Sequence, residues 1–331
     1  MSAHGPNPLL QALWPFGLLY GTCMAVRNWT FDARLREVVD LGVPVTSVGN
    51  LTVGGTGKTP TVLWLAQRAH ELGHRVGVLA RGYGRQPGAR LNDEGMLLER
   101  RLPWLLQEQD PDRVAAGRKL VAQGATLILV DDGFQHRRVA RDADLVCMDA
   151  RRPFADGALL PAGMLREFRS GLARATAILL TRAGSLSAAD LEDRVTVLRR
   201  YAHQPKLPVF ATHHQPIDVL REPDGTVLPL EALRGRRVVA LCAIARPDAF
   251  EATLRELGAE PVRTLAYRDH HTFTARELQA ALDHAHRQDA LLVTTEKDAV
   301  RMGDFDGERH VLRIGLRFLG AEPTPEQLRW R

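Results

Sequence analysis

The segment Thr52–Thr59, which reads TVGGTGKT, constrains the fold more than any other part of the chain. It follows an apolar run at 43–48 and precedes a run at 60–72 with apolar residues at helical spacing. A strand, a glycine-rich loop and a helix in this order are typical of a phosphate-binding loop, whose backbone N–H groups surround phosphate oxygens. The pattern predicts that Lys58 reaches the β- and γ-phosphates and that the Thr59 hydroxyl binds Mg²⁺.

The loop departs from the usual pattern at its first position, where Thr52 stands in place of glycine. The three glycines inside the loop supply the backbone freedom instead. The alternative is a glycine-rich turn that binds no ligand. The nucleotide-binding residues expected here are Thr52, Val53, Gly54, Gly55, Thr56, Gly57, Lys58 and Thr59.

A second acidic motif supports nucleotide chemistry. Asp131 and Asp132 follow the apolar run LILV at 127–130. A buried strand that ends in an acidic residue holds the Mg²⁺ of many phosphate-binding-loop enzymes, directly or through water. An acidic residue at a strand end is common by itself. The two aspartates therefore indicate a Mg²⁺ site only because the TVGGTGKT segment is also present.

Apolar runs and helical patterns alternate along the chain, which predicts an α/β fold with a parallel sheet. Further strands are expected at 76–80, 127–130, 145–148 and 177–180. A second set follows, with strands at 237–242, 261–266, 290–294 and 310–314 and helices at 247–257 and 274–287. The turn signal REPDGTV at 221–227 suggests a boundary. We therefore expect a nucleotide-binding core at 37–220 and a smaller α/β domain at 221–331.

Length and composition fit this division. The chain has 331 residues, enough for two domains at roughly 100–200 residues each. The formal net charge of +5 is mild and does not require a nucleic-acid partner. Three cysteines, Cys23, Cys147 and Cys242, lie far apart, so a zinc finger, an iron–sulfur motif and a disulfide framework are not expected.

The N-terminal segment is unusually apolar. Residues 1–26 contain no Asp, Glu, Lys or Arg. A signal peptide would need a basic start, and Pro15 and Gly17 interrupt a transmembrane helix. Two alternatives stay open: a helix in the membrane interface and a helix packed on the protein's own core. We expect 1–36 to form a separate apolar helix associated with the membrane.

The nucleotide motifs alone do not define the reaction. Guanine selectivity usually needs N/T-K-x-D, and the segment Thr295–Asp298 has similar letters in a different order. Partitioning ATPases carry a lysine just before G-G-x-G-K-T, where this chain has Val53. Both classes are disfavoured.

Six segments occur in a distinctive order: VTSVGNLTVGGTGKTP, RGYG, DDGFQHR, LPAGMLRE, DHHTF and TTEKDAVR. This ordered set resembles the tetraacyldisaccharide 4'-kinase family, the lipid A 4'-kinases of Gram-negative bacteria. The resemblance implies a phosphate-binding-loop NTPase-type core with a smaller α/β domain. It also implies ATP and Mg²⁺, a lipid A disaccharide precursor as acceptor of the γ-phosphoryl group, and a peripheral or monotopic location on the cytoplasmic side of the inner membrane. No obligate protein partner is implied.

The resemblance also implies roles for residues outside the loop. Asp93, in the segment NDEG, matches the family's catalytic base most closely, and His270 matches the histidine that assists it. The residues flanking Asp93 differ from the family pattern, so a surface-loop aspartate stays an alternative. The other matched positions near the nucleotide are Tyr83, Asp131, Asp132, Gln135, Arg166 and Glu167. The expected metal ligands are Thr59, Asp131 and Glu167.

Two other classes of function are weighed against the kinase. A partner-stimulated ATPase would use the same loop without phosphorylating a lipid. A binding module with a decayed nucleotide site would lack the reactive residues, whereas Lys58, Thr59 and Asp131 are all present. The apolar N-terminus favours the kinase, since its lipid acceptor lies in a membrane.

Overall fold

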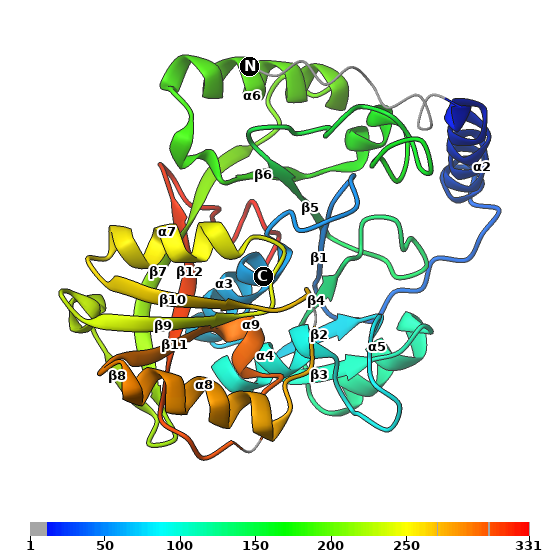
Figure 1. The fold of residues 1–331 in the computed structure, drawn as a ribbon. Coiled ribbons are helices and arrows are strands. Elements are labelled where there is room, and N and C mark those ends of the chain that lie inside the picture. The colour runs from blue at the N-terminus through cyan, green and yellow to red at the C-terminus, as the bar shows by residue number, and fades with distance from the viewer. Residues whose placement is uncertain (1–11, 270, 304, 331) are drawn as a thin grey trace. The chain divides into compact units, whose positions relative to one another are not determined.

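The computed structural model describes residues 12–269, 271–303 and 305–330. It divides into two compact units (Figure 1). Unit 1 comprises Met1–Tyr83, Leu102–His214 and Leu316–Arg331, and unit 2 comprises Gly84–Arg101 and Gln215–Gly315. Each unit is described by itself below.

Unit 1 is built on a parallel sheet. Its strands lie in the order β7-β6-β5-β1-β4-β2-β3, and every pairing within this run is parallel. The strands β1, β4, β5 and β6 are buried nearly throughout, as expected for strands covered on both faces. The bounds are β1 Val45–Gly49, β2 Val76–Ala80, β3 Leu106–Gln109, β4 Leu127–Asp131, β5 Ala143–Asp149, β6 Ala177–Thr181 and β7 Val209–Glu222.

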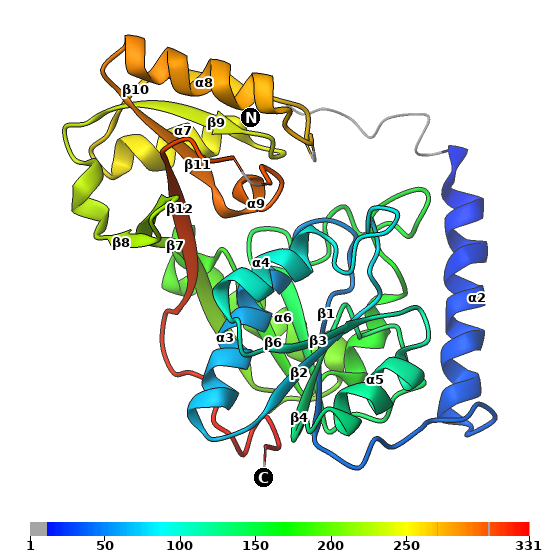
Figure 2. The same cartoon turned by 90° about the horizontal axis from the view of Figure 1, so that it is seen from below.

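Helices cover both faces of this sheet. On β5, Val146 and Met148 belong to a core that includes residues of α6, whereas Cys147 points to Thr61 of α3. Side chains alternate along a strand, so α3 and α6 lie on opposite faces. Figure 2 shows the unit from a second direction. The helix bounds are α2 Trp14–Asp32, α3 Lys58–Glu71, α5 Arg113–Ala122 and α6 Ala188–Ala202.

Unit 2 holds a second sheet with a helix on each face. Its strands follow the order β10-β9-β11-β12-β7, and β8 pairs antiparallel with β7. On β9, Val238 and Ala240 pack with α7, while Val239 and Leu241 pack with α8. The bounds are α4 Asp93–Arg101, β8 Thr226–Leu228, β9 Arg237–Cys242, α7 Pro247–Glu256, β10 Glu260–Ala266, α8 Ala275–Arg287, β11 Leu291–Thr295, α9 Glu296–Ala299 and β12 Arg309–Phe318.

The predicted α/β class, with a parallel core and a second, smaller α/β unit, is confirmed. The units differ from the expected segments 1–36, 37–220 and 221–331: residues 12–36 group with unit 1, and residues 215–220 group with unit 2. Residues 84–101 group with unit 2, and residues 316–331 return to unit 1. The return is anchored where Trp330 donates its indole N–H to the Thr46 hydroxyl at 2.8 Å. The expected turn at 221–227 joins β7 to β8.

Helix α2 packs against the rest of unit 1 along one face, which was one of the two alternatives left open for the N-terminus. One face is packed: a Cβ added at Gly17 or Gly21 would meet Leu159, Ala162 or Phe168. The opposite face exposes large apolar side chains: Phe16, Leu18, Leu19, Val26 and Trp29. Among the residues that the structure describes, no helix is long and apolar enough to cross a membrane.

Candidate active site

The glycine-rich loop connects the end of β1 to the start of α3, as the sequence predicts. Gly54 and Gly57 have φ values of +103° and +83°, a backbone region that favours glycine. At Gly57 there is also no room for a side chain, because the ring of His214 occupies the space that a Cβ would need. These constraints explain why glycine stands at both positions.

The segment LPAGMLRE lies against this loop. Thr52 forms an antiparallel bridge with Leu165. Val53 donates its backbone N–H to the Met164 carbonyl at 2.8 Å, and Arg166 donates its backbone N–H to the Leu51 carbonyl at 2.8 Å. This pairing brings two motifs that are more than a hundred residues apart to one edge of the sheet.

Opposite charges meet at the end of the loop. Lys58 Nζ lies 3.5 Å from Asp132 Oδ1, and Arg166 Nη1 lies 2.8 Å from both carboxylate oxygens of Asp132. Burial raises the pKa of Asp132, but the charges and hydrogen bonds of Lys58 and Arg166 outweigh it and hold the pKa below its ordinary value. The cluster therefore presents two cations around one ionised carboxylate.

Two oxygen ligands suited to Mg²⁺ lie at the same edge. Thr59 is in the first turn of α3 and Asp131 ends β4, and both side chains are nearly buried. Hydroxyl and carboxylate oxygens are the ligands that Mg²⁺ prefers, and phosphate oxygens and waters usually complete its shell. No group of three or more His, Cys, Asp and Glu side chains arranged for a metal occurs among the described residues. The donor set therefore fits a Mg²⁺ ion that is bound together with a nucleotide.

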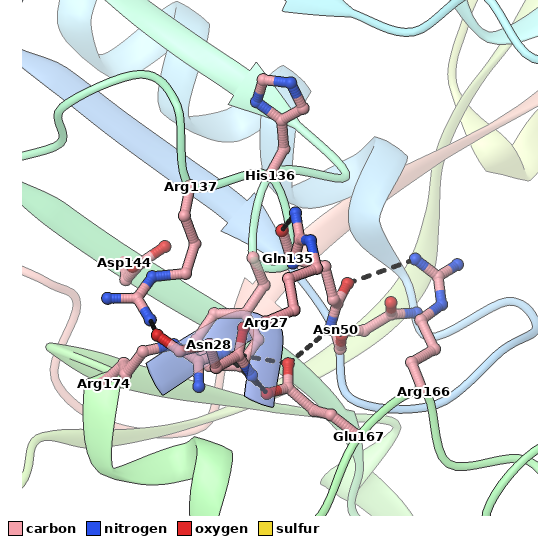
Figure 3. Close-up of polar contacts among 12 residues, drawn as sticks. Arg27, Asn28, Asn50, Gln135, His136, Arg137, Asp144, Arg166, Glu167 and Arg174 are labelled. Carbon is pink, nitrogen blue, oxygen red and sulfur yellow. Dashed lines mark hydrogen bonds and ion pairs between the residues drawn. The ribbon is translucent and has the colours of Figure 1, made fainter. Parts of the chain in front are cut away.

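Glu167 is buried, with only 1% of its surface exposed, and has three partners (Figure 3). Arg174 Nη2 lies 2.9 Å from both of its oxygens. Gln135 Nε2 donates to Oε1 at 2.9 Å, and Asn28 Nδ2 donates to Oε2 at 2.8 Å. The predicted role of Glu167 as a metal ligand stays a prediction. In this arrangement both of its oxygens accept hydrogen bonds from protein groups.

A second arginine, Arg182, follows β6 and supports the loop together with Asp149, the last residue of β5. Arg182 Nη2 donates to the Gly55 carbonyl at 2.8 Å, and its Nη1 lies 2.7 Å from Asp149 Oδ2. Burial raises the pKa of Asp149, but hydrogen bonds from Arg151 and Arg182 lower it to about 2. The ionised Asp149 therefore holds Arg182 against the loop at neutral pH.

The remaining predicted residues lie in different places. Tyr83 is 86% exposed, in the turn after β2. Asp93 belongs to unit 2, and it begins helix α4 instead of lying in a loop. Its Oδ2 accepts from Arg301 Nε at 2.8 Å, and Arg301 belongs to the TTEKDAVR segment. His270 lies outside the described residues.

Several residues of the site were missed from the sequence. Asn28 and Arg174 contact Glu167, and Asp149 and Arg182 support the loop. Asn28 had a usable signal, because it lies on the same helical face as Gly17 and Gly21, at i+11 and i+7. His214 was also missed: it lies in β7 with its ring against Gly57. That contact joins segments far apart in sequence and has no local signature.

The fold and the site define a class: a nucleotide-binding protein with a phosphate-binding loop and its lysine at the carboxyl edge of a parallel sheet. Comparison with known proteins narrows this class. The family model described as tetraacyldisaccharide-1-P 4'-kinase matches residues 9–329. The chain belongs to this family, which confirms the resemblance drawn from the sequence.

Individual relatives agree. A tetraacyldisaccharide 4'-kinase from Anaeromyxobacter sp. (strain Fw109-5) is 42% identical over 321 residues, which cover 91% of this chain and 85% of the relative. A tetraacyldisaccharide 4'-kinase from Syntrophus aciditrophicus is 36% identical and covers 91% of this chain and 86% of its own length. The crystal structure of LpxK from Aquifex aeolicus in complex with ATP matches with a TM-score of 0.78 and 26% identity, covering 97% of this chain and 98% of that one.

Proposed function

We propose that this chain transfers the γ-phosphoryl group of ATP to the 4'-hydroxyl of a tetraacyldisaccharide 1-phosphate, the precursor of lipid A. The observation that carries the proposal is the cluster of Lys58, Asp132 and Arg166 at the phosphate-binding loop, in a chain of this family. The 4'-oxygen forms a bond to the γ-phosphorus, the bond from that phosphorus to the bridging oxygen breaks, and ADP leaves. Lys58, Arg166 and the loop N–H groups neutralise charge on the phosphates and position them.

Mg²⁺ is the cofactor that the site would take, held by the Thr59 hydroxyl and the Asp131 carboxylate. When bound, it neutralises charge on the phosphates of ATP. Asp131 Oδ1 accepts the backbone N–H of Asp132 at 2.9 Å, which fixes the direction of its carboxylate. Two protein ligands leave coordination positions for phosphate oxygens and water.

Asp93 is the proposed base that takes the proton of the 4'-hydroxyl. The ion pair with Arg301, whose side chain is only 5% exposed, fixes its carboxylate at the start of α4. Arg301 is itself held by the Ala243 carbonyl at 3.2 Å. A rigidly held carboxylate suits a base, because proton transfer needs a short and directed contact with the acceptor. His270 is proposed to assist Asp93, as the family resemblance implies.

The lipid acceptor fits two features of unit 1. A cavity of about 810 Å³ lies between α2, the segment 157–170 and α6, and it has an apolar lining that includes Leu159, Ala162 and Phe168. Arg169 and Arg200 also line it and provide cations for a lipid phosphate. The exposed apolar face of α2 would rest in the membrane surface. We therefore place the enzyme peripherally, on the cytoplasmic side of the inner membrane, where ATP is available.

The deciding experiment is a mass-resolved phosphorylation assay. The full-length protein is incubated with ATP, Mg²⁺ and tetraacyldisaccharide 1-phosphate in detergent, and the lipid product is weighed. We expect a product heavier by one phosphoryl group. Lys58→Ala should reduce its formation by at least about a hundredfold, since the lysine contacts the transferred group. Asp93→Asn should lower kcat by a factor of about 10²–10⁴ with little change in ATP affinity.

Two results would contradict the proposal. Steady ATP loss without a lipid product would favour a partner-stimulated ATPase. Neither product nor ATP loss would favour a binding module with an inactive nucleotide site. Full activity in Asp93→Asn would remove only the assignment of the base.

A further inference from the structure

Helix α2 has a buried polar side chain, Asn28, on its packed face where this face contacts Glu167. The face contains Gly17, Gly21 and Phe31, and among them Asn28 is 9% exposed. A buried amide that lacks a partner costs about 1–3 kcal/mol, so a buried asparagine needs a partner. Here the partner is the buried carboxylate of Glu167 at 2.8 Å.

Two further hydrogen bonds join the same turn of α2 to the DDGFQHR segment. Arg27 Nη2 donates to the Gln135 carbonyl at 2.9 Å. Arg137 Nη1 donates to the Asn28 carbonyl at 2.9 Å. The helix is therefore fixed to the segment that follows the acidic strand end, as well as to Glu167 (Figure 3).

The contacts continue from Glu167 to the phosphate-binding loop. Gln135 Nε2 donates to Glu167 and also to the carbonyl of Asn50, two residues before the loop begins at Thr52, each at 2.9 Å. Arg166, the neighbour of Glu167 in sequence, holds Asp132, which lies beside Lys58. Displacing Glu167 would therefore move groups on both sides of the loop.

We propose that Asn28 is a positioning residue. By holding the carboxylate of Glu167, it couples the packed position of helix α2 to the positions of the side chains in the phosphate-binding cluster. The donor orientation of its amide is required, because an oxygen facing the carboxylate would be repelled. Arg174 neutralises Glu167, and Asn28 sets where the neutralised carboxylate lies relative to α2. This inference rests on the proposed function only in taking ATP as the nucleotide, and its test measures ATP binding without phosphoryl transfer.

The test compares two variants by Mg-ATP titration calorimetry on the full-length protein in detergent. Asn28→Asp keeps the shape of the side chain but replaces the donor with an acceptor beside Glu167. Asn28→Ala removes the group. We expect the Kd for ATP to rise about tenfold in Asn28→Asp and about threefold to fivefold in Asn28→Ala. Thr22→Ala is the matched control, because its hydroxyl bonds only within α2, to the Leu18 carbonyl, and its Kd should stay within twofold.

A double-mutant cycle separates positioning from a general loss of stability. In a Glu167→Ala background, Asn28→Ala should change the Kd for ATP by less than twofold, because the partner is already gone. An ATP affinity in Asn28→Asp equal to that of the parent would overturn the inference, and so would a full effect of Asn28→Ala without Glu167. If the parent protein makes no phosphorylated lipid but these ATP effects appear, the proposed function fails and the positioning role stands.

Discussion

At the scale of single residues, the phosphate-binding cluster combines one carboxylate with two cations. Asp132 is shared by Lys58 and Arg166, so its carboxylate keeps two cations close together before a nucleotide arrives. Two cations without an intervening anion would repel each other. The triphosphate would then meet cations that are already in place, which reduces the reorganisation needed on binding.

His136, next to Gln135, gives a prediction about acid stability. Burial, together with Arg113 and Arg141, lowers its pKa from 6.5 to about 4. The unfolded chain therefore binds this proton more readily than the folded chain, so the contribution of His136 to stability is complete above pH 6.5 and is lost as the pH falls towards 4. The loss amounts to about 3 kcal/mol for the full shift.

We expect His136→Gln to make the free energy of unfolding less dependent on pH in this window. Urea denaturation at pH 7.5 and pH 4.5 measures the difference. The variant should lose about 2 kcal/mol less than the parent between these pH values. His286→Gln, on the exposed side of α8, is the control and should behave like the parent. An unchanged pH dependence in His136→Gln would show that other groups cause the acid sensitivity.

At the scale of elements, the junction between the glycine loop and α3 is under two separate constraints. Gly57 needs a positive φ, and the His214 ring excludes a Cβ. Gly73, which follows α3, has a φ of +88° with nothing near the Cβ position. The two glycines therefore share the backbone constraint and differ in the steric one.

This pair allows a matched test. Both Gly57→Ala and Gly73→Ala should lower stability by about 1–2 kcal/mol because of the left-handed backbone. Only Gly57→Ala should also weaken ATP binding, by at least about tenfold, since the added methyl pushes the loop away from His214. Thermal denaturation and Mg-ATP titration measure the two effects. Equal ATP affinities in the two variants would show that the contact with His214 does not shape the loop.

Elements with a strong local pattern were predictable from the sequence. The strands 76–80 and 237–242 were predicted with the bounds that the structure has. Each is a short, mostly apolar run whose ends are visible in the sequence. Helix α4 was not predicted, and a surface loop at Asp93 was kept as an alternative. Its segment DEGMLLERR has few apolar positions, so packing within unit 2 and the ion pair with Arg301 determine its conformation.

At the scale of the whole molecule, the apolar face of α2 predicts how the protein meets a membrane. The double variant Leu19→Glu with Val26→Glu puts two charges on that face, where both residues are exposed. Burying side chains of this size in lipid contributes about 1.5–3 kcal/mol each, so binding should fall at least about tenfold. Co-sedimentation with vesicles of anionic phospholipid measures the bound fraction.

Leu72→Glu is the control for this experiment. Leu72 is also an exposed apolar residue, but it follows α3 and has no part in the apolar face of α2. Its variant should bind vesicles like the parent. Undiminished binding by the α2 variant would place the membrane contact elsewhere on the protein.

The division of the chain was only partly accessible from the sequence. Six ordered motifs were enough to predict the family, because each motif is local. The assignment of residues 84–101 to unit 2 and of the C-terminal residues to unit 1 depends on contacts between distant segments, such as Trp330 with Thr46. The partner of Asn28 could not be predicted for the same reason, since Glu167 lies 139 positions away.

The packed face of helix α2 has a practical consequence for shortened forms of this enzyme. An apolar N-terminal helix is a common target for deletion when a more soluble variant is wanted. Here a truncation that removes the helix would also remove the hydrogen-bond donor of Glu167 and the arginine that contacts Gln135. Solubility is better sought by replacing residues of the outer face, such as Phe16 and Trp29, while Gly17, Gly21 and Asn28 are kept.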